Sequence, residues 1–423
     1  MNIYMTSRER IIAALNHKQP DRVPVDFGCT PVSGIAVSTV SKLRKAFGLD
    51  SGGDRVKVLE PYQMLGEVDD ALRRKMLGDG AGMFGKINRF GFPNSDWKEW
   101  TTFDGEDVLV PGLFNTVPDE KGDILMYPEG DTSVPPSACM PEGGFYFDTL
   151  IRQYPIEEEK LDSANNLEDF SFISEDQLED FSAQSEWLRA HTDYGIFLNM
   201  PGTSLGNISS VPAPWLKDPK GIRDIEEWYV SLLIRGDYIR EIFKGQTEIS
   251  MKNLVMMKEA VDDRADIVYL TGTDFGTQRG PITSREIYRD LFMPFYKEMC
   301  DWIHENTSWK TMIHTCGGIR PLIEDIIDSG FDILNPVQTS AEGMDSAELK
   351  KEYGDRVVFH GGGVDTQHTL PHGTPEEVYD EVRERIRILN RDGGYIFNTI
   401  HNIQADVPVE NIFALLKAIE DST

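Results

Sequence analysis

Short apolar segments alternate with longer amphipathic ones between residues 195 and 398, and no other feature of the chain constrains the fold as strongly. The apolar segments are rich in Ile, Val and Leu, which favours strands that are buried on both faces. Such strands are typical of a parallel sheet covered by helices on both sides. The predicted strands are residues 195–200, 267–271, 311–314, 332–337, 357–360 and 395–398, and the predicted helices between them are residues 224–243, 248–262, 283–306, 319–329, 345–353 and 375–390.

Two further strands bring the predicted total to eight. Residues 22–28 have the pattern of a first strand that ends in a Gly turn, and one more strand is predicted between residues 55 and 90. Eight strand–helix repeats predict an α/β fold of the (β/α)8 TIM-barrel type. Residues 6–17 predict an amphipathic helix before the first strand, with Thr6 and Glu9 as its capping box. Further helices are predicted at residues 34–47, 65–77 and 156–190.

The region from residue 78 to residue 150 has a different composition. It is rich in Gly, Pro and aromatic residues such as Trp97 and Trp100, and its short alternating runs lie between turn signals. This pattern predicts β-hairpins. We therefore expect residues 1–423 to form a single barrel domain in which residues 78–150 are an inserted subdomain rich in β-hairpins.

The composition excludes several classes of partner. With 42 Lys and Arg against 71 Asp and Glu, the chain has a formal net charge of −29, which disfavours binding to nucleic acid and to anionic membrane surfaces. No apolar run reaches the roughly 20 residues that a membrane span needs, and the first residues lack the pattern of a signal peptide. Four widely spaced cysteines suit a reducing compartment. We expect a cytoplasmic protein.

Five consecutive predicted strands end in polar residues with catalytic or metal-binding chemistry. These residues are Asp274 and Gln278, Cys316, Gln338 and Glu342, His360 and Asp365, and His401 and Asn402. Active sites of (β/α)8 barrels lie at the carboxyl ends of the strands. Loops are polar in general, but the recurrence of such residues after five strands indicates a functional site.

His314 and Cys316 lie at the centre of this predicted site. If residues 311–316 are extended, side chains two residues apart point to the same side, so an imidazole and a thiol converge at one strand end. Nitrogen and thiolate donors are those that Zn²⁺ prefers, and a catalytic zinc ion normally has three protein ligands. The candidates for the third ligand are, in order, His401, Glu342, Asp274 and His360. A core histidine beside a small buried thiol is the alternative explanation.

Several segments resemble the uroporphyrinogen decarboxylase superfamily. They are the Arg8–Arg10 helix with Pro20–Asp26, and the segments Gly276–Pro281, His314–Gly317, Asp332–Gln338, Gly373–Val378 and Pro408–Ile412. The resemblance covers nearly the whole chain except residues 78–190, and it implies one (β/α)8 barrel with its pocket at the strand ends. The decarboxylase branch holds a tetrapyrrole with eight carboxylates through an Arg-rich loop after the first strand. Residues 28–33 of this chain contain no arginine.

The chain is more similar to the corrinoid-dependent methyltransferase branch of that superfamily. In that branch zinc is held by a His-x-Cys pair and a later cysteine. His314 and Cys316 match the pair, and His401 stands where the later cysteine would be. The resemblance implies a zinc-dependent methyltransferase of the O-demethylase type. Such an enzyme moves a methyl group from a small methylated substrate, such as a methoxylated aromatic compound, to the cobalt of a corrinoid (cobalamin).

The remaining predicted roles follow from this resemblance. The predicted catalytic residues, which orient the substrate or transfer protons, are Asp274, Gln338 and Asn402. The predicted substrate-binding residues are Gln278, His360 and Asp365. The chain has no Asp-x-His-x-x-Gly motif of a corrinoid-carrying domain, so the corrinoid is expected on a separate partner protein. The alternatives are a metal-free decarboxylase of another substrate and a non-catalytic subunit of a corrinoid complex.

Overall fold

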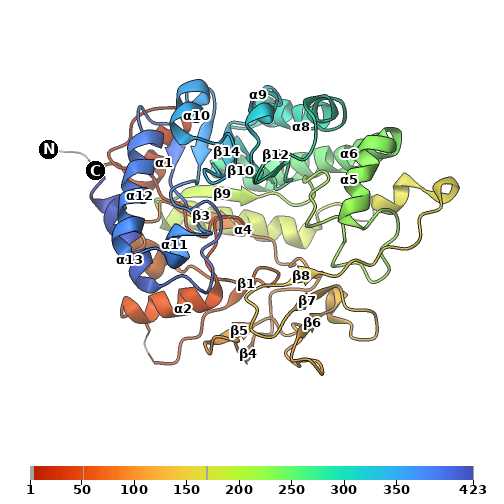
Figure 1. Ribbon diagram of the computed structural model, residues 1–423, viewed down its shortest axis with the longest axis horizontal. Helices are drawn as coiled ribbons and strands as arrows, with labels where there is room; N and C mark the ends of the chain where they lie inside the picture. The colour runs from red at the N-terminus through yellow and green to blue at the C-terminus, as the bar shows by residue number, and fades with distance from the viewer. Residues whose placement is uncertain (1–3, 51, 168–169, 423) are drawn as a thin grey trace.

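The structure is a computed structural model that describes residues 4–50, 52–167 and 170–422. Its largest sheet has seven parallel strands in the order β16-β15-β14-β13-β10-β9-β3 (Figure 1). These strands are β3 (Gly80–Met83), β9 (Gly195–Asn199), β10 (Ile267–Thr271), β13 (Lys310–His314), β14 (Ile333–Asn335), β15 (Val358–His360) and β16 (Tyr395–Ile396).

The chain at Val25 closes this sheet into a barrel. Val25 forms a parallel bridge with Phe397, directly after β16. On its other side, the carbonyl oxygen of Val25 accepts a hydrogen bond from the amide of Asp79, directly before β3. The first predicted strand thus lies between the two edge strands, and the strand predicted between residues 55 and 90 is β3. The predicted fold class, a (β/α)8 barrel, is confirmed.

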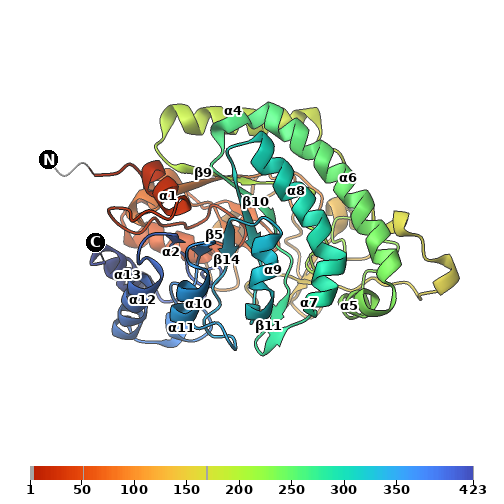
Figure 2. The same ribbon diagram turned by 90° about the horizontal axis from the view of Figure 1, so that it is seen from above.

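Helices surround the barrel, and Figure 2 shows α6 and α8 running side by side on its outside. The α-helices in the described ranges are α1 (Ser7–Leu15), α2 (Val37–Ala46), α3 (Asp70–Lys75), α4 (Glu175–His191), α5 (Ile225–Ile234), α6 (Gly236–Val261), α7 (Arg285–Ile287), α8 (Met293–Asn306), α9 (Ile323–Asp328), α10 (Ser346–Tyr353), α11 (Thr369–His372), α12 (Pro375–Leu389) and α13 (Val409–Glu420). The capping box of α1, Thr6 with Glu9, is present as predicted. None of the helices in those ranges is both long and apolar enough to cross a membrane.

Three predicted helix boundaries are wrong. The long helical stretch after residue 224 breaks at Arg235 rather than near residue 245. Arg235 has a non-helical backbone (φ −125°, ψ 40°), and its guanidinium donates to Glu158 and Glu227. In the predicted helix 156–190, the α-helix α4 begins only at Glu175, because Ser174 caps it through the amide of Gln177. Within the predicted helix 65–77, only α3 is α-helical.

Two small antiparallel sheets occupy the region of predicted hairpins and lie together on one side of the barrel (Figure 1). Their strands are β4 (Lys98–Thr101) with β5 (Asp107–Val110), and β6 (Ile124–Met126), β7 (Ala138–Met140) and β8 (Asp148–Thr149). Two further strand pairs are β1 (Val58–Glu60) with β2 (Leu65–Gly66), and β11 (Gly276–Thr277) with β12 (Gly280–Pro281). The predicted hairpin region starts at residue 78, but β3 within it is a barrel strand. The small sheets begin only at Lys98. That residues 78–150 are an inserted subdomain of one domain stays a proposal.

The barrel interior begins with an apolar layer. It contains Phe197, Ile267, Met312, Ile333, Val358 and Ile396, one residue from each of six neighbouring strands, packed with Ile11, Ala14 and Leu15 of α1. Alternate residues on the same strands pack outward in the larger core beneath the helices. Helix α1 therefore closes the amino-terminal end of the barrel, and only the carboxyl end of the strands remains open for a site.

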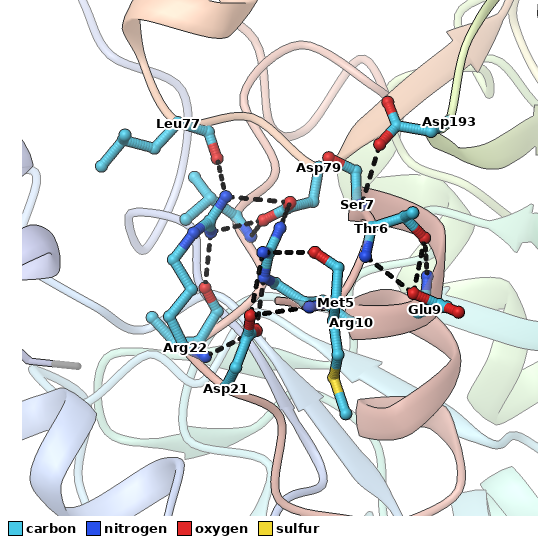
Figure 3. Close-up of polar contacts among 12 residues, drawn as sticks. Met5, Thr6, Ser7, Glu9, Arg10, Asp21, Arg22, Leu77, Asp79 and Asp193 are labelled. Atoms are coloured by element: carbon cyan, nitrogen blue, oxygen red, sulfur yellow. Dashed lines mark hydrogen bonds and ion pairs between the residues drawn. The ribbon is translucent and has the colours of Figure 1, made fainter. Parts of the chain in front are cut away.

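An ion-pair network ties α1 to the closure of the barrel at that amino-terminal end (Figure 3). Asp79 is fully buried. Its carboxylate accepts hydrogen bonds from Arg10 at 3.0 Å, from Arg22 at 2.6 and 2.9 Å, and from the amide of Val25 at 3.0 Å. Arg10 also donates to Asp21 at 2.6 Å. Because Asp79 precedes β3 and Val25 lies in the closing strand, this carboxylate fixes the point at which the barrel closes.

Candidate metal centre

A polar layer lies above the apolar layer of the barrel interior, toward the carboxyl ends of the strands. Side chains two residues apart on a strand point to the same side, so each residue two positions after an apolar-layer residue also points inward. The polar layer therefore consists of Asn199, Tyr269, His314, Asn335, His360 and Asn398. This layer supports the candidate site from below.

Three potential metal ligands meet just above this layer: the ligand atoms of His314, Cys316 and His401 all lie within 4.8 Å of one another. His314 ends β13 and Cys316 follows it by two residues, whereas His401 comes from the loop after β16. Cys316 Sγ lies 3.3 Å from His314 Nε2, and the ring centroids of His314 and His401 are 5.3 Å apart. The structure thus brings together the three residues that the sequence ranked first as ligands.

A buried chain of hydrogen bonds runs from Asp26 through His360 and Asn335 to His314. Asp26 Oδ2 lies 2.9 Å from His360 Nε2, His360 Nδ1 lies 2.6 Å from Asn335 Nδ2, and Asn335 Oδ1 lies 2.5 Å from His314 Nδ1. Asp26, His360 and Asn335 are fully buried, and His314 nearly so. We call these four residues the Asp26–His314 relay.

The relay has a defined direction. Asn335 Nδ2 also lies 3.2 Å from the carbonyl oxygen of His360, which can only accept, so the amide NH₂ faces His360 and the amide oxygen faces His314. His360 Nδ1 is then an acceptor, and His360 Nε2 carries the proton that is donated to Asp26. By the same logic His314 carries its proton on Nδ1. His314 Nε2 then accepts from the Cys316 thiol at 3.3 Å, and its lone pair faces the other two potential ligands.

Burial sets the protonation states of the three potential ligands. It lowers the pKa of His314 to about 4 and, with the influence of His314, that of His401 to about 4, so both imidazoles are neutral near pH 7. Burial and the neighbouring Asp274 raise the pKa of the Cys316 thiol well above its usual value. Neutral imidazoles are the metal-binding form, whereas the thiol loses its proton when a metal binds.

The three residues fit a zinc ion in donor type and spacing. Tetrahedral zinc, with bonds of about 2.0 Å to nitrogen and 2.3 Å to sulfur, separates its ligand atoms by roughly 3.3 to 3.8 Å. The separation of 3.3 Å between His314 Nε2 and Cys316 Sγ lies at the lower end of that range. His401 Nδ1 accepts a hydrogen bond from the amide of Asn402 at 2.8 Å. Metal binding would replace this contact of His401 and also the contact between the Cys316 thiol and His314 Nε2.

The candidate site opens onto a cavity of about 500 Å³ whose wall includes His401 and Asp274. Asp274 Oδ1 accepts a hydrogen bond from the amide of Cys316 at 2.7 Å and lies 3.8 Å from His314 Nε2. Asp274 thus holds the backbone of one potential ligand and presents a carboxylate next to another. Of the predicted catalytic residues, it is the one that faces the cavity.

Two glycines allow the Cys316 loop to approach its neighbour closely. Gly317 has φ +92°, and a Cβ at this position would lie 2.3 Å from the backbone carbon of Gly276. A Cβ on Gly276 would in turn lie 2.5 Å from the carbonyl oxygen of Cys316. Only glycine fits at either position, so the glycines at the start of the β11–β12 hairpin and after Cys316 fix where the thiol lies.

Gln338 and Asn402 support the site instead of lining the cavity. Gln338 Oε1 accepts a hydrogen bond from the amide of Gly317 at 2.6 Å, beside Cys316. Asn402 is buried, accepts from the amide of Gly34, and donates to the carbonyl of Pro31 and to Gln63. That these two residues act on the substrate stays a prediction. Their amides are already engaged with the protein, and we propose positioning roles for both.

None of the three predicted substrate-binding residues lines the cavity. His360 is fully buried and uses both ring nitrogens in the relay. Gln278 is exposed on the β11–β12 hairpin and contacts Gln367, and Asp365 caps its own turn through the amides of the next residues. A position after a strand does not fix which way a loop side chain points, and the substrate-binding roles of these three residues stay predictions. Glu342, Asp274 and His360, the other candidates for the third ligand, are outside the group of three.

Sequence reasoning missed several residues of the cavity wall, among them Arg89, Asn199 and Tyr269. Asn199 ends β9, and the rule that selected polar residues at strand ends applies to it equally. Tyr269 lies inside a strand, where an aromatic residue is expected from its β-propensity alone, so the sequence does not indicate a functional role for it. Arg89 lies six residues beyond β3 in an irregular segment, and no local pattern points to it.

Residues 202–206 also have the Gly-x-Ser-x-Gly spacing of a hydrolase nucleophile. Ser204 lines the cavity, and its Oγ accepts a hydrogen bond from the amide of Gly272 at 3.3 Å. Turns rather than a helix follow it, and in the described part of the chain no histidine is hydrogen-bonded to Ser204. These features do not support a nucleophilic serine.

We expect the relay to control metal affinity. Replacing Asn335 with leucine, which has a similar shape, removes both hydrogen bonds that fix the proton on His314 Nδ1. Loss of such outer contacts typically weakens metal binding by about 10- to 100-fold. Zinc affinity measured by competition with a chromogenic chelator tests this expectation. Asn398→Leu is the matched control, because Asn398 is a buried polar-layer amide that contacts the backbone of Asp26 and not His314. Equal zinc affinities of the two variants would contradict the role of the relay.

Comparisons with known proteins place part of the chain in a family. Residues 244–422 match the family described as Uroporphyrinogen decarboxylase (URO-D). Among curated relatives, a uroporphyrinogen decarboxylase of Psychromonas ingrahamii is 27% identical over 150 residues, covering 35% of this chain and 40% of that protein. The methylcobamide:CoM methyltransferase MtaA of Methanosarcina barkeri is 24% identical over 177 residues, covering 42% and 50%. A methylated-thiol–coenzyme M methyltransferase of Methanosarcina mazei is 27% identical over 141 residues, covering 33% and 35%.

These alignments span half or less of each curated relative. A solved structure of a methyltransferase from Methanosarcina mazei is similar over 99% of both chains, with a TM-score of 0.55 and 15% identity. At that identity the likeness shows the fold alone. The relatives include both decarboxylases and methyltransferases, so the resemblance noted in the sequence is confirmed at the level of the superfamily.

Proposed function

We propose that this chain, whose residues 244–422 match the URO-D family, is a zinc-dependent methyltransferase. In this proposal it moves a methyl group from a small methylated substrate, for which we prefer a methoxylated aromatic compound, to the cobalt of a separate corrinoid protein. The observation that carries the proposal is the group His314, Cys316 and His401 beside a cavity of about 500 Å³. The similarity to two methyltransferases supports the same class.

The residues of the site have distinct roles in this proposal. His314, Cys316 and His401 hold the zinc ion, which when bound acts as a Lewis acid toward the ether oxygen of the substrate. Asp274 orients the substrate from the cavity wall, and aromatic side chains of that wall offer flat apolar surface to a ring. Those side chains are Tyr62, Phe84, Phe170, Trp215, Trp228 and Tyr269.

The reaction balances as a displacement at the methyl carbon. The carbon–oxygen bond breaks and its electron pair stays on the oxygen, which then takes a proton from water. The cobalt(I) of the partner's corrinoid supplies the electron pair of the new cobalt–carbon bond. The chain contributes by holding the methoxy group at the mouth of the barrel, where a partner protein can reach it.

Decarboxylation of a smaller substrate is the second candidate. It is favoured by the similarity to uroporphyrinogen decarboxylases and by Asp274, whose pKa is raised by burial and which can therefore act as an acid. A tetrapyrrole with eight carboxylates is disfavoured as the substrate. Among the described residues of the cavity wall Arg89 is the one arginine, so eight carboxylates would find a single guanidinium there.

Methyl transfer tests the proposal directly. The zinc-loaded protein is mixed under anaerobic conditions with a reduced corrinoid protein and a panel of methoxylated aromatic compounds. We expect the absorbance of methyl-cobalt to appear with at least one donor. Carbon dioxide release from carboxylated donors without methyl-cobalt would favour the decarboxylase. A stable complex with the corrinoid protein that gives neither product would favour a non-catalytic subunit.

A further inference from the structure

The cavity wall carries one positive charge, and this charge has no acidic partner in direct contact. Among the described residues that line the cavity, the charged side chains are Arg89, Glu60 and Asp274. In the described part of the chain, no carboxylate oxygen lies within 4.0 Å of the Arg89 guanidinium. Arg89 is partly exposed to solvent and lines the cavity, so a carboxylate that enters the cavity can form an ion pair with its guanidinium.

Neutral contacts hold Arg89 in place. Its Nη2 donates a hydrogen bond to Ser210 Oγ at 2.9 Å, and its guanidinium carbon lies 5.4 Å from the centre of the Tyr62 ring. The Tyr62 ring and the Ser210 hydroxyl restrain the guanidinium, and the hydroxyl occupies only one of its five N–H groups. The planar fork therefore remains available to a ligand in the cavity.

Glu60 does not neutralise this fork by direct contact. Its two carboxylate oxygens accept hydrogen bonds from the amides of Gln63 at 2.7 Å and Tyr62 at 3.4 Å. Burial raises the pKa of Glu60, although the charge of Arg89 opposes that shift. Glu60 is thus committed to the amides of its own turn.

The cavity connects Arg89 with the candidate metal centre, because Arg89, Tyr269, Asp274 and His401 all line it. Tyr269 lines the same cavity and offers an aromatic ring to a ligand that spans it. The ends of the cavity thus differ, with a cation at one and potential metal ligands at the other.

We propose that Arg89 is an anion-binding subsite, and that the substrate is a methylated aromatic acid whose carboxylate pairs with Arg89 while its methoxy group faces His401. Guanidinium and carboxylate match as planar, bidentate partners. On a chain with a net charge of −29, a single cation inside the cavity selects for one carboxylate and against a polyanion. The methoxy end of this assignment rests on the proposed function, whereas the carboxylate end rests on Arg89 alone.

Calorimetric binding to the metal-free protein tests the subsite, because no bound metal can then capture the carboxylate. The probes are 4-methoxybenzoate and its neutral analogue 4-methoxybenzamide. We expect the wild-type protein to bind the acid about 10- to 100-fold more tightly than the amide, and Arg89→Gln to lose this preference. Lys86→Gln is the matched control, since it also removes one positive charge but from an exposed residue of the same loop that pairs with Asp176. We expect it to keep the preference.

Two further variants guard against a folding defect. Arg89→Lys keeps the charge but loses the planar fork, and Ser210→Ala removes the hydrogen bond that holds it; each is expected to lower the preference for the acid part of the way. Equal binding of acid and amide by the wild-type protein, no binding of the acid at millimolar concentration, or an unchanged preference in folded Arg89→Gln would overturn the subsite.

The outcome is separable from that of the proposed function. Selective acid binding that depends on Arg89, without any methyl transfer to a corrinoid protein, would support the anion-binding subsite and contradict the proposed methyltransferase function. Methyl transfer that is equally efficient from acidic and neutral donors would support the methyltransferase function and contradict the anion-binding subsite.

Discussion

Replacing Cys316 with alanine is expected to remove zinc from the purified protein and to abolish methyl transfer to a corrinoid protein. Structural zinc sites bind with roughly 10 to 16 kcal/mol. Shared over three protein ligands, this makes the loss of one donor worth about 3 to 5 kcal/mol, or roughly 10²- to 10⁴-fold in affinity. The effect is largest at the thiolate, because it is the one anionic donor of the three. Zinc content by mass spectrometry and affinity by chelator competition measure it.

The matched control for this prediction is Cys139→Ser. Cys139 lies in β7 of the small antiparallel sheets, is half-buried and is outside the group of three potential ligands. We expect this variant to retain about one zinc ion per chain, if the wild-type protein does. Wild-type protein without zinc, or a Cys316→Ala variant that binds zinc as tightly as Cys139→Ser, would contradict the assignment of this site as a zinc site. The decarboxylase would then become the better candidate.

Replacing Asp79 with alanine is expected to lower the free energy of unfolding by about 3 to 5 kcal/mol. The variant leaves Arg22 without the carboxylate that accepts two of its hydrogen bonds, takes one partner from Arg10, and leaves the amide of Val25 unpaired (Figure 3). Breaking a buried pair on one side costs more than the pair itself contributes, because the desolvated cation remains. Denaturant titration followed by both fluorescence and circular dichroism measures the loss.

Asp21→Ala provides the comparison for Asp79. Asp21 pairs with Arg10 as well, at 2.6 Å, but its side chain is 23% exposed against 0% for Asp79. Water can therefore replace part of the hydrogen bonding that Asp21 provides to Arg10. We expect the free energy of unfolding to fall by about 1 kcal/mol. If both variants lose the same stability, the network contributes as an ordinary surface ion pair and does not determine how the barrel closes.

Local patterns in the sequence were sufficient for most of the barrel. The Ile- and Val-rich segments form strands because their residues are apolar on both faces. Alternate residues of each strand pack in the barrel interior and in the outer core beneath the helices. The capping box of Thr6 and Glu9 formed because it depends on residues three apart. The predicted helix boundaries were wrong where a contact with a distant residue determines them. Arg235 is an example, because its partner Glu158 is 77 residues away.

The pair His314 and Cys316 followed from the sequence alone, because strand geometry places residues two apart on one side. The remaining parts of the site required the closed barrel. His360 and Asp26 are 334 residues apart in the chain and 2.9 Å apart in space, and His401 and Arg89 reach the same cavity from opposite ends of the sequence. A strand fixes which side its residues face, since that depends on backbone dihedral angles. Which residues meet across the barrel depends on register, closure and loop direction, and these are set by packing of the whole chain.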